Sequence, residues 1–114
     1  MSHRTLVVVL VVVACVSPRP GLAEWTDRWD RVRQALPVAD SLEKSDCQTA
    51  LTELREARTE LIPGPSERLD EMVDAWIREA ETVYFDCPPP EGFREAFTRL
   101  DQMARQVDDA AGRG

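Results

Sequence analysis

The chain has 114 residues and a formal net charge of −7, with 21 acidic side chains against 14 basic ones. A chain of this length forms one small domain with a limited core. Its acidic balance opposes binding to nucleic acid and to anionic lipid headgroups, so we expect neither partner.

The N-terminus has the pattern of a secretory signal. The basic residues His3 and Arg4 precede an unbroken apolar run of 11 residues, Leu6 to Val16. A transmembrane helix needs about 20 such residues, whereas a signal peptide has a basic start, a short apolar core and small residues after it. We therefore predict export to the periplasm or outside the cell, in a bacterial envelope setting.

Two processing routes fit this segment. Gly21-Leu22-Ala23 has the small-x-small form of a signal peptidase site, which makes residues 1–23 the signal. Val12-Val13-Ala14-Cys15 resembles the lipobox of bacterial lipoproteins, in which the signal is 1–14, Cys15 is acylated and 16–23 form a tether. In that route the lipid on Cys15 is the only contact with a membrane, and the protein is anchored in the envelope. The two routes stay open at this point.

A helical hairpin is predicted over residues 41–62 and 66–86. Apolar residues recur at steps of three and four in both arms, which places them on one helix face. Asp40 and Glu43 form a capping-box pattern at the start, and Pro63-Gly64-Pro65-Ser66 separates the arms. The stripes are Leu42, Cys47, Ala50, Leu51, Leu54, Ala57, Leu61 and Ile62 in the first arm, and Leu69, Met72, Val73, Trp76, Ile77, Ala80, Val83, Tyr84 and Cys87 in the second.

Cys47 and Cys87 lie in phase with these stripes, so we predict a disulfide between the two arms. Closing a loop of this length stabilises the fold by roughly 4 kcal/mol through chain entropy. Counted from the turn, Cys87 lies six residues farther along its helix than Cys47. That offset is about 9 Å, so we expect the second arm to unwind near Phe85 and Asp86, or the arms to cross at an angle.

Two further helices are predicted, at 24–36 and 90–111, and no strand pattern appears after the signal. The fold class expected for residues 24–112 is therefore a small, antiparallel, all-α bundle of three to four helices. Trp25 and Trp29 lie one turn apart in the first of these helices. Their rings are either buried against the helical hairpin or form part of a binding surface.

The residue types disfavour catalysis. The only histidine is His3, inside the predicted signal, and paired cysteines leave no thiolate. We expect no enzyme activity, no metal and no cofactor. Carboxylates cluster on the second arm, where a solvated acidic face is the ordinary explanation; they are Glu67, Asp70, Glu71 and Asp74.

A binding function remains, and two forms of it are considered. The first is protein–protein contact through a candidate binding patch of aromatic residues, Trp25, Trp29, Tyr84 and Phe85. The alternative is a carrier of a small apolar ligand in the bundle core, lined by Trp76, Phe93, Phe97 and Met103. We identify no family resemblance beyond the lipobox, so no binding residue is transferred from another protein.

Overall fold

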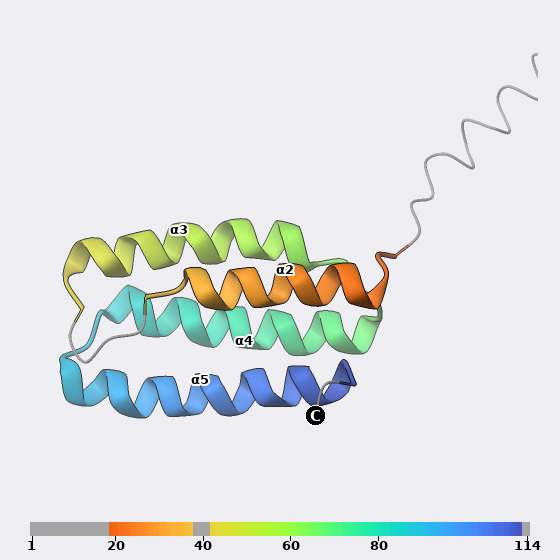
Figure 1. Cartoon of the computed structure of the whole chain (residues 1–114). Helices are drawn as coiled ribbons and strands as arrows, with labels where there is room; N and C mark the ends of the chain where they lie inside the picture. The colour runs from red at the N-terminus through yellow and green to blue at the C-terminus, as the bar shows by residue number, and fades with distance from the viewer. Residues whose placement is uncertain (1–18, 38–41, 113–114) are drawn as a thin grey trace, which may run out of the picture.

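The computed structural model describes residues 19–37 and 42–112, and its regular structure in these ranges is entirely helical. Successive helices run in opposite directions (Figure 1). The described residues therefore form the antiparallel all-α bundle predicted from the sequence. Its helices are α2 (Leu22–Ala35), α3 (Lys44–Leu61), α4 (Glu67–Asp86) and α5 (Pro90–Ala110).

The start of α3 differs from the prediction. Its N-cap is Glu43, whose side chain accepts a hydrogen bond from the backbone of Asp46 while Asp46 accepts one from the backbone of Glu43. This reciprocal capping box satisfies free N–H groups of the first turn, so α3 begins three residues later than expected. Asp40, the cap expected from the sequence, lies outside the described residues.

The ends of α4 follow the sequence closely. The Ser66 hydroxyl accepts a hydrogen bond from the backbone N–H of Leu69 at 3.2 Å, as an N-cap should. At the other end Cys87 adopts a left-handed conformation with φ of 44°, and three prolines follow it. The left-handed residue turns the chain out of the helix and into α5.

The disulfide offset is taken up by the α3–α4 linker. The expectation that α4 unwinds near Phe85 is wrong, because the helix continues to Asp86. Residues 62–66 instead run on past the end of α3 before α4 begins (Figure 1). The linker therefore shifts α4 along the bundle axis, and the Cα atoms of Cys47 and Cys87 lie 5.9 Å apart.

The core is formed by the predicted apolar stripes, and three tryptophans lie at its centre. Trp25 and Trp29 of α2 stack at a centroid distance of 5.9 Å, and Trp29 meets Trp76 of α4 edge-on at 4.9 Å. Such pairs add to the apolar area that the rings bury. Other fully or nearly fully buried residues are Leu54, Leu61, Val73, Ile77, Tyr84, Phe93 and Val107.

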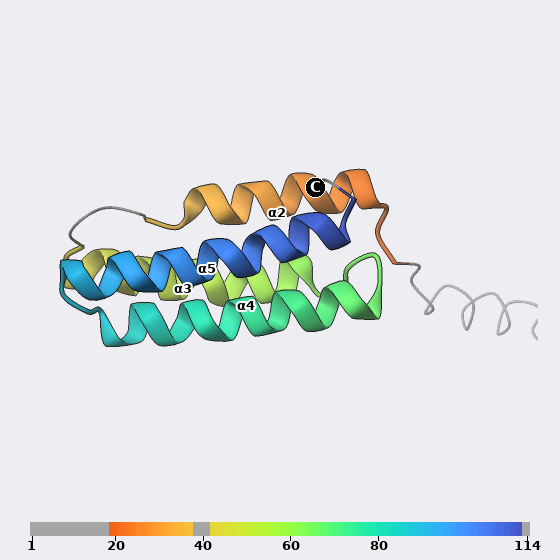
Figure 2. The same ribbon diagram turned by 90° about the horizontal axis from the view of Figure 1, so that it is seen from below.

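The four helices do not close into an evenly packed ring. Cα atoms approach within 8 Å between α2 and α3, between α3 and α4, and between α4 and α5, but not between described residues of α2 and α5 (Figure 2). Side chains span the α2–α5 seam instead. Trp29 donates to Asp108 at 2.9 Å, and Arg33 pairs with Asp108 and Asp101.

Within the described ranges, none of the helices combines the length and the apolar character needed to cross a membrane.

Candidate binding cavity

A cavity of about 520 Å³ lies at the α2–α5 seam, with α4 contributing to its walls. Its volume is in the range of pockets that hold small organic ligands. The lining residues come from three helices and the residue that follows α2: Arg33 and Leu36; Trp76 and Tyr84; Phe97, Thr98, Leu100, Asp101, Ala104 and Arg105.

The lining is mostly apolar, and its charged members pair with each other or with neighbours. Asp101 forms ion pairs with Arg105 at 2.9 Å and with Arg33 at 3.6 Å, and Arg33 also pairs with Asp108 at 3.2 Å. These side chains are half-buried or exposed. Each arginine at the cavity therefore already has a carboxylate partner, which weakens its attraction for an anionic ligand.

The three tryptophans differ in how their indole N–H groups are satisfied, and the N–H of Trp76 is enclosed by protein atoms. Trp25 donates to the carbonyl of Leu61 at 3.0 Å, and Trp29 donates to Asp108. The Nε1–H of Trp76 is buried and has no hydrogen-bond partner among the described residues, although the side chain is only 3 % exposed. Leaving a buried donor without an acceptor costs about 1–3 kcal/mol, so this group calls for an explanation.

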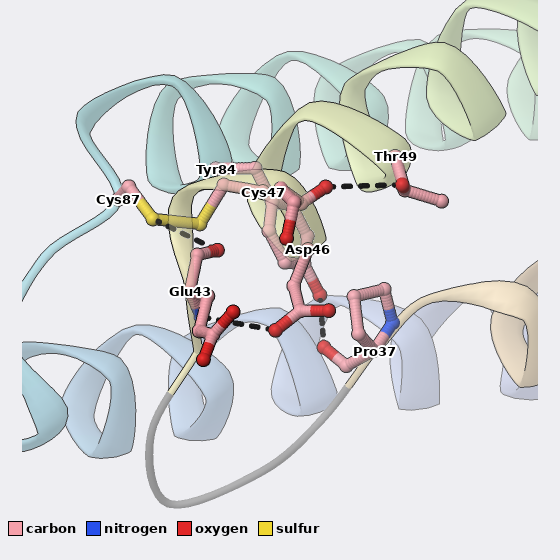
Figure 3. Close-up of a disulfide and its surroundings, with 8 residues drawn as sticks. Pro37, Glu43, Asp46, Cys47, Thr49, Tyr84 and Cys87 are labelled. Carbon is pink, nitrogen blue, oxygen red and sulfur yellow. Dashed lines mark hydrogen bonds between the residues drawn. A yellow bond between two sulfur atoms is a disulfide. The ribbon is translucent and has the colours of Figure 1, made fainter.

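Tyr84 supplies a second polar group to the wall, but its hydroxyl is satisfied. It donates to the carbonyl of Pro37 at 2.9 Å and so ties the end of α2 to α4 (Figure 3). Burial raises the pKa of Tyr84 to about 12, since desolvation penalises the phenolate. The cavity wall therefore presents a neutral phenol at physiological pH.

The residues of the predicted aromatic patch are separated by burial. Trp25, Trp29 and Tyr84 are core residues, whereas Phe85 is 78 % exposed. The two α2 tryptophans are on the face that packs onto the hairpin, as one of the two sequence-based interpretations expected. Of the four residues, Phe85 alone is available at the surface.

The residues expected to line a carrier site are also divided. Trp76 and Phe97 line the cavity, but Phe93 and Met103 are not among its walls. Phe93 is buried and stacks on Phe97 at 5.3 Å, so it supports the wall from behind. The contribution of α2, through Arg33 and Leu36, was missed, because periodicity does not show how far one helix stands from another.

A second, more open hollow of about 470 Å³ lies between α3 and α4, and Phe85 forms part of its edge. Its other lining residues are Leu51, Arg55, Glu81 and Thr82. Phe85 is the largest exposed apolar side chain described. Its lining is also mainly apolar, and it is only somewhat more open to solvent than the cavity at the α2–α5 seam.

Of the four acidic residues expected to cluster on α4, Asp70 and Asp74 have structural roles, whereas Glu67 and Glu71 are exposed. Asp70 accepts from the backbone N–H of Gly64 at 2.6 Å and pairs with Arg19 at 2.8 Å, which holds the α3–α4 linker. Asp74 pairs with Arg58 and with Arg78. No group of three or more His, Cys, Asp or Glu side chains suited to a metal ion occurs in the part of the chain that the structure describes.

Arg58 joins α3 to α4 through two carboxylates. Burial acts to lower the pKa of Arg58, but hydrogen bonds to Glu81 and Asp74 outweigh it and raise the pKa overall. The guanidinium is therefore a permanent cation between two acids. Asp74 and Glu81 therefore have a cationic partner within the protein and need no ligand to balance their charge.

The Cys47–Cys87 disulfide lies at the end of the bundle where α2 ends, α3 begins and α4 ends (Figure 3). Predicted from the sequence, it is confirmed here, and it links α3 to the residue after α4. A disulfide fits an oxidising extracellular or periplasmic location. Cys15, the predicted lipidation residue, lies outside the described residues.

Comparison with known proteins gives no match: no family model, no curated protein and no solved structure is similar to the chain at a significant level. The functional argument therefore depends on the residues and their geometry.

Proposed function

We propose that this is an exported, non-catalytic binding protein that holds a small, largely apolar molecule in the cavity at the α2–α5 seam. The observation that carries the proposal is the cavity itself, which has a volume of about 520 Å³ and is lined mainly by apolar side chains from the end of α2, from α4 and from α5. Sites that hold small molecules are typically concave and lined mainly by apolar and aromatic side chains, with a few polar groups among them. The cavity therefore favours the carrier hypothesis over protein–protein contact.

A non-catalytic role is consistent with the residues near the cavity. Asp101 and Asp108 are held by ion pairs and hydrogen bonds, and Tyr84 donates its proton to a backbone carbonyl. The two cysteines of the domain are joined. None of these groups is an activated nucleophile, because the carboxylates and the phenol are engaged and the disulfide leaves no thiolate.

Fluorescence titration tests the proposal directly, because Trp76 lines the cavity. We expect a neutral polarity-sensitive dye, N-phenyl-1-naphthylamine, to bind saturably and to change the emission of the disulfide-intact protein. Ala104→Leu adds side-chain volume inside the cavity, so it should weaken dye binding at least tenfold.

Phe85→Ala is the matched control, because this side chain is exposed and is not among the cavity walls. It should leave dye binding unchanged. Absence of saturable binding to the wild-type protein, or equal binding to Ala104→Leu, would overturn the proposal, provided that circular dichroism shows each variant folded.

We also propose that the protein reaches the envelope by the lipoprotein route, with Cys15 as its first residue. The contacts of Arg19 support this choice: its guanidinium donates to the carbonyl of Gly64 at 2.9 Å and to Asp70 at 2.8 Å. In addition, α2 begins at Leu22, and the carbonyl of Gly21 accepts from the backbone N–H of Trp25. Cleavage after Ala23 would remove these groups, whereas cleavage before Cys15 keeps them all.

Intact mass of the protein from its native envelope fraction decides between the routes. A species that begins at acylated Cys15 and gains two hydrogens on reduction is expected. A species that begins at Glu24 would contradict the lipoprotein route and leave the proposed cavity to be tested separately.

One observation favours protein–protein contact as a second candidate function, namely the exposed ring of Phe85 beside the α3–α4 hollow. A photo-crosslinking amino acid, p-benzoylphenylalanine, placed at position 85 should give a discrete adduct in the native envelope. Leu22, which is 45 % exposed, is the control position. Equal adducts from both positions, or none from position 85, would contradict this candidate.

A further inference from the structure

We infer that the Arg33–Asp101 ion pair is a strap across the mouth of the cavity at the α2–α5 seam, and that its opening controls how fast a ligand enters and leaves. This inference rests on the proposed function and adds the control of exchange at the same cavity. It depends on where the two residues lie, on how α2 and α5 are joined, and on the second partner that each charge has.

The lining of the cavity divides into a buried floor and a partly exposed mouth. The floor is mainly apolar and consists of the buried lining residues, Leu36, Trp76, Tyr84, Leu100 and Ala104. The mouth consists of the lining residues with solvent-exposed surface, Arg33 of α2 and Phe97, Thr98, Asp101 and Arg105 of α5. A ligand from solvent therefore reaches the floor by passing between Arg33 and the α5 residues.

The strap joins the two sides of this mouth. Described residues of α2 and α5 have no Cα atoms within 8 Å of each other, so side-chain contacts hold the seam. Arg33 and Asp101 approach to 3.6 Å, and their side chains are 32 % and 46 % exposed. Ion pairs with this much exposure are weak, so the strap can break and re-form without disturbing the fold.

Each member of the strap keeps a partner when the strap opens. The Arg33 guanidinium also pairs with Asp108 at 3.2 Å and lies over the Trp29 ring, 5.7 Å from its centroid. Asp101 also pairs with Arg105 on its own helix at 2.9 Å. Opening therefore leaves neither charge without a partner, and the closed and open arrangements differ little in free energy.

The test measures the rate constants with which N-phenyl-1-naphthylamine binds to and dissociates from the disulfide-intact protein, by stopped-flow fluorescence. Asp101→Asn removes the strap, so both rate constants should rise about two- to fivefold, the effect expected of one partly exposed ion pair. The dissociation constant should change by less than about twofold, because a strap acts on entry and exit alike.

A second variant makes a prediction of opposite sign. Arg105→Gln removes the Asp101–Arg105 pair, as Asp101→Asn does, but it leaves the strap in place. Asp101 then has lost its alternative partner, so the strap should open less often and both rate constants should fall about twofold. Loss of the Asp101–Arg105 pair alone cannot make one variant faster and the other slower.

Glu79→Gln is the matched control, because it also changes a carboxylate to an amide and breaks an interhelical ion pair of α5, with Arg99 at 2.9 Å. Neither of these residues is among the cavity walls. The control should therefore leave both rate constants unchanged. Circular dichroism confirms that each variant is folded before its rates are compared.

The outcomes separate the inference from the function on which it depends. Absence of saturable dye binding to the wild-type protein overturns the proposed function. Saturable binding with rate constants that Asp101→Asn leaves unchanged, or that both mouth variants shift in the same direction, overturns the strap alone. Faster exchange in Asp101→Asn, slower exchange in Arg105→Gln and unchanged exchange in Glu79→Gln support it.

Discussion

The three tryptophans share one cluster in the core but differ in what accepts their N–H. For Trp25 the acceptor is the last carbonyl of α3, for Trp29 it is a carboxylate of α5, and for Trp76 there is none among the described residues. Replacement of each by phenylalanine therefore removes a similar ring volume at all three positions, but a hydrogen bond only at Trp25 and Trp29. Comparing the free energies of unfolding of the three variants therefore isolates the contribution of the indole hydrogen bond.

Trp25→Phe should lower the free energy of unfolding by about 1–2 kcal/mol more than Trp76→Phe does, because it leaves the buried carbonyl of Leu61 without its donor. Urea denaturation followed by far-ultraviolet circular dichroism measures both values. An equal or larger loss for Trp76→Phe would mean that its N–H has an acceptor in the unliganded protein.

Tyr84 predicts a pH dependence in the alkaline range. Its pKa is raised by burial to about 12 in the folded state, against 10.0 for an exposed tyrosine. Above pH 10 the unfolded chain loses this proton while the folded chain keeps it, so stability is intact below pH 10 and falls as the pH rises to about 12. The total loss is roughly 2–3 kcal/mol.

Because Tyr84 is the single tyrosine of the chain, its absorbance at high pH reports this ionisation without interference from others. Denaturation of the wild-type protein and Tyr84→Phe between pH 9 and 12 isolates the effect from other groups that titrate there. Identical pH profiles for the two proteins would show that Tyr84 is not shielded from solvent.

At the scale of elements, the α3–α4 linker is constrained by how closely α2 approaches it. A Cβ on Gly64 would lie 2.8 Å from Trp25 Nε1, 3.1 Å from the carbonyl oxygen of Leu61 and 3.2 Å from Asp70 Oδ1. Two of these groups are a buried ring and backbone, which cannot move away freely. Only a residue without a side chain fits there.

Gly64→Ala should therefore lower the free energy of unfolding by about 1–3 kcal/mol, as overpacking usually does. Gly21→Ala is the control, since nothing lies within 4 Å of the Cβ it would add. The difference between their urea midpoints measures the effect. Midpoints that shift equally would place the strain elsewhere than at the linker.

The helices could be predicted to within three residues at each end, for identifiable reasons. Prolines fix the end of α4 and the start of α5, and Ser66 caps α4 as its position suggests. The start of α3 could not be predicted, because Glu43 fits a capping box with either Asp40 or Asp46. Local spacing gives no means of ranking two such patterns.

For the whole molecule, the disulfide joins the two helices that form the central contact of the bundle. Replacing both Cys47 and Cys87 with serine should lower the free energy of unfolding by about 4 kcal/mol, because the unfolded chain regains the freedom of a long loop. In urea denaturation, the reduced wild-type protein should have the same midpoint as the double variant. If the reductant also shifts the midpoint of the double variant, its effect is unrelated to this bond.

The cavity is the feature that sequence patterns predicted least. Trp76 and Phe97 were expected to line a ligand site, but Arg33 and Leu36 were not. Apolar spacing shows which face of each helix turns inward. It does not show that α2 and α5 stay apart and are bridged by side chains, since that separation depends on the volumes of all the packed residues together.

The bundle also has two distinct poles. Arg19 contacts the α3–α4 linker at one pole, and α5 ends at that same pole, whereas the disulfide and Phe85 are at the other (Figure 1). With α4 20 residues long, the poles are about 30 Å apart. A bead or surface joined to Arg19 or Gly112, the first and last described residues, would thus be attached at the pole opposite the disulfide and leave the disulfide pole uncovered.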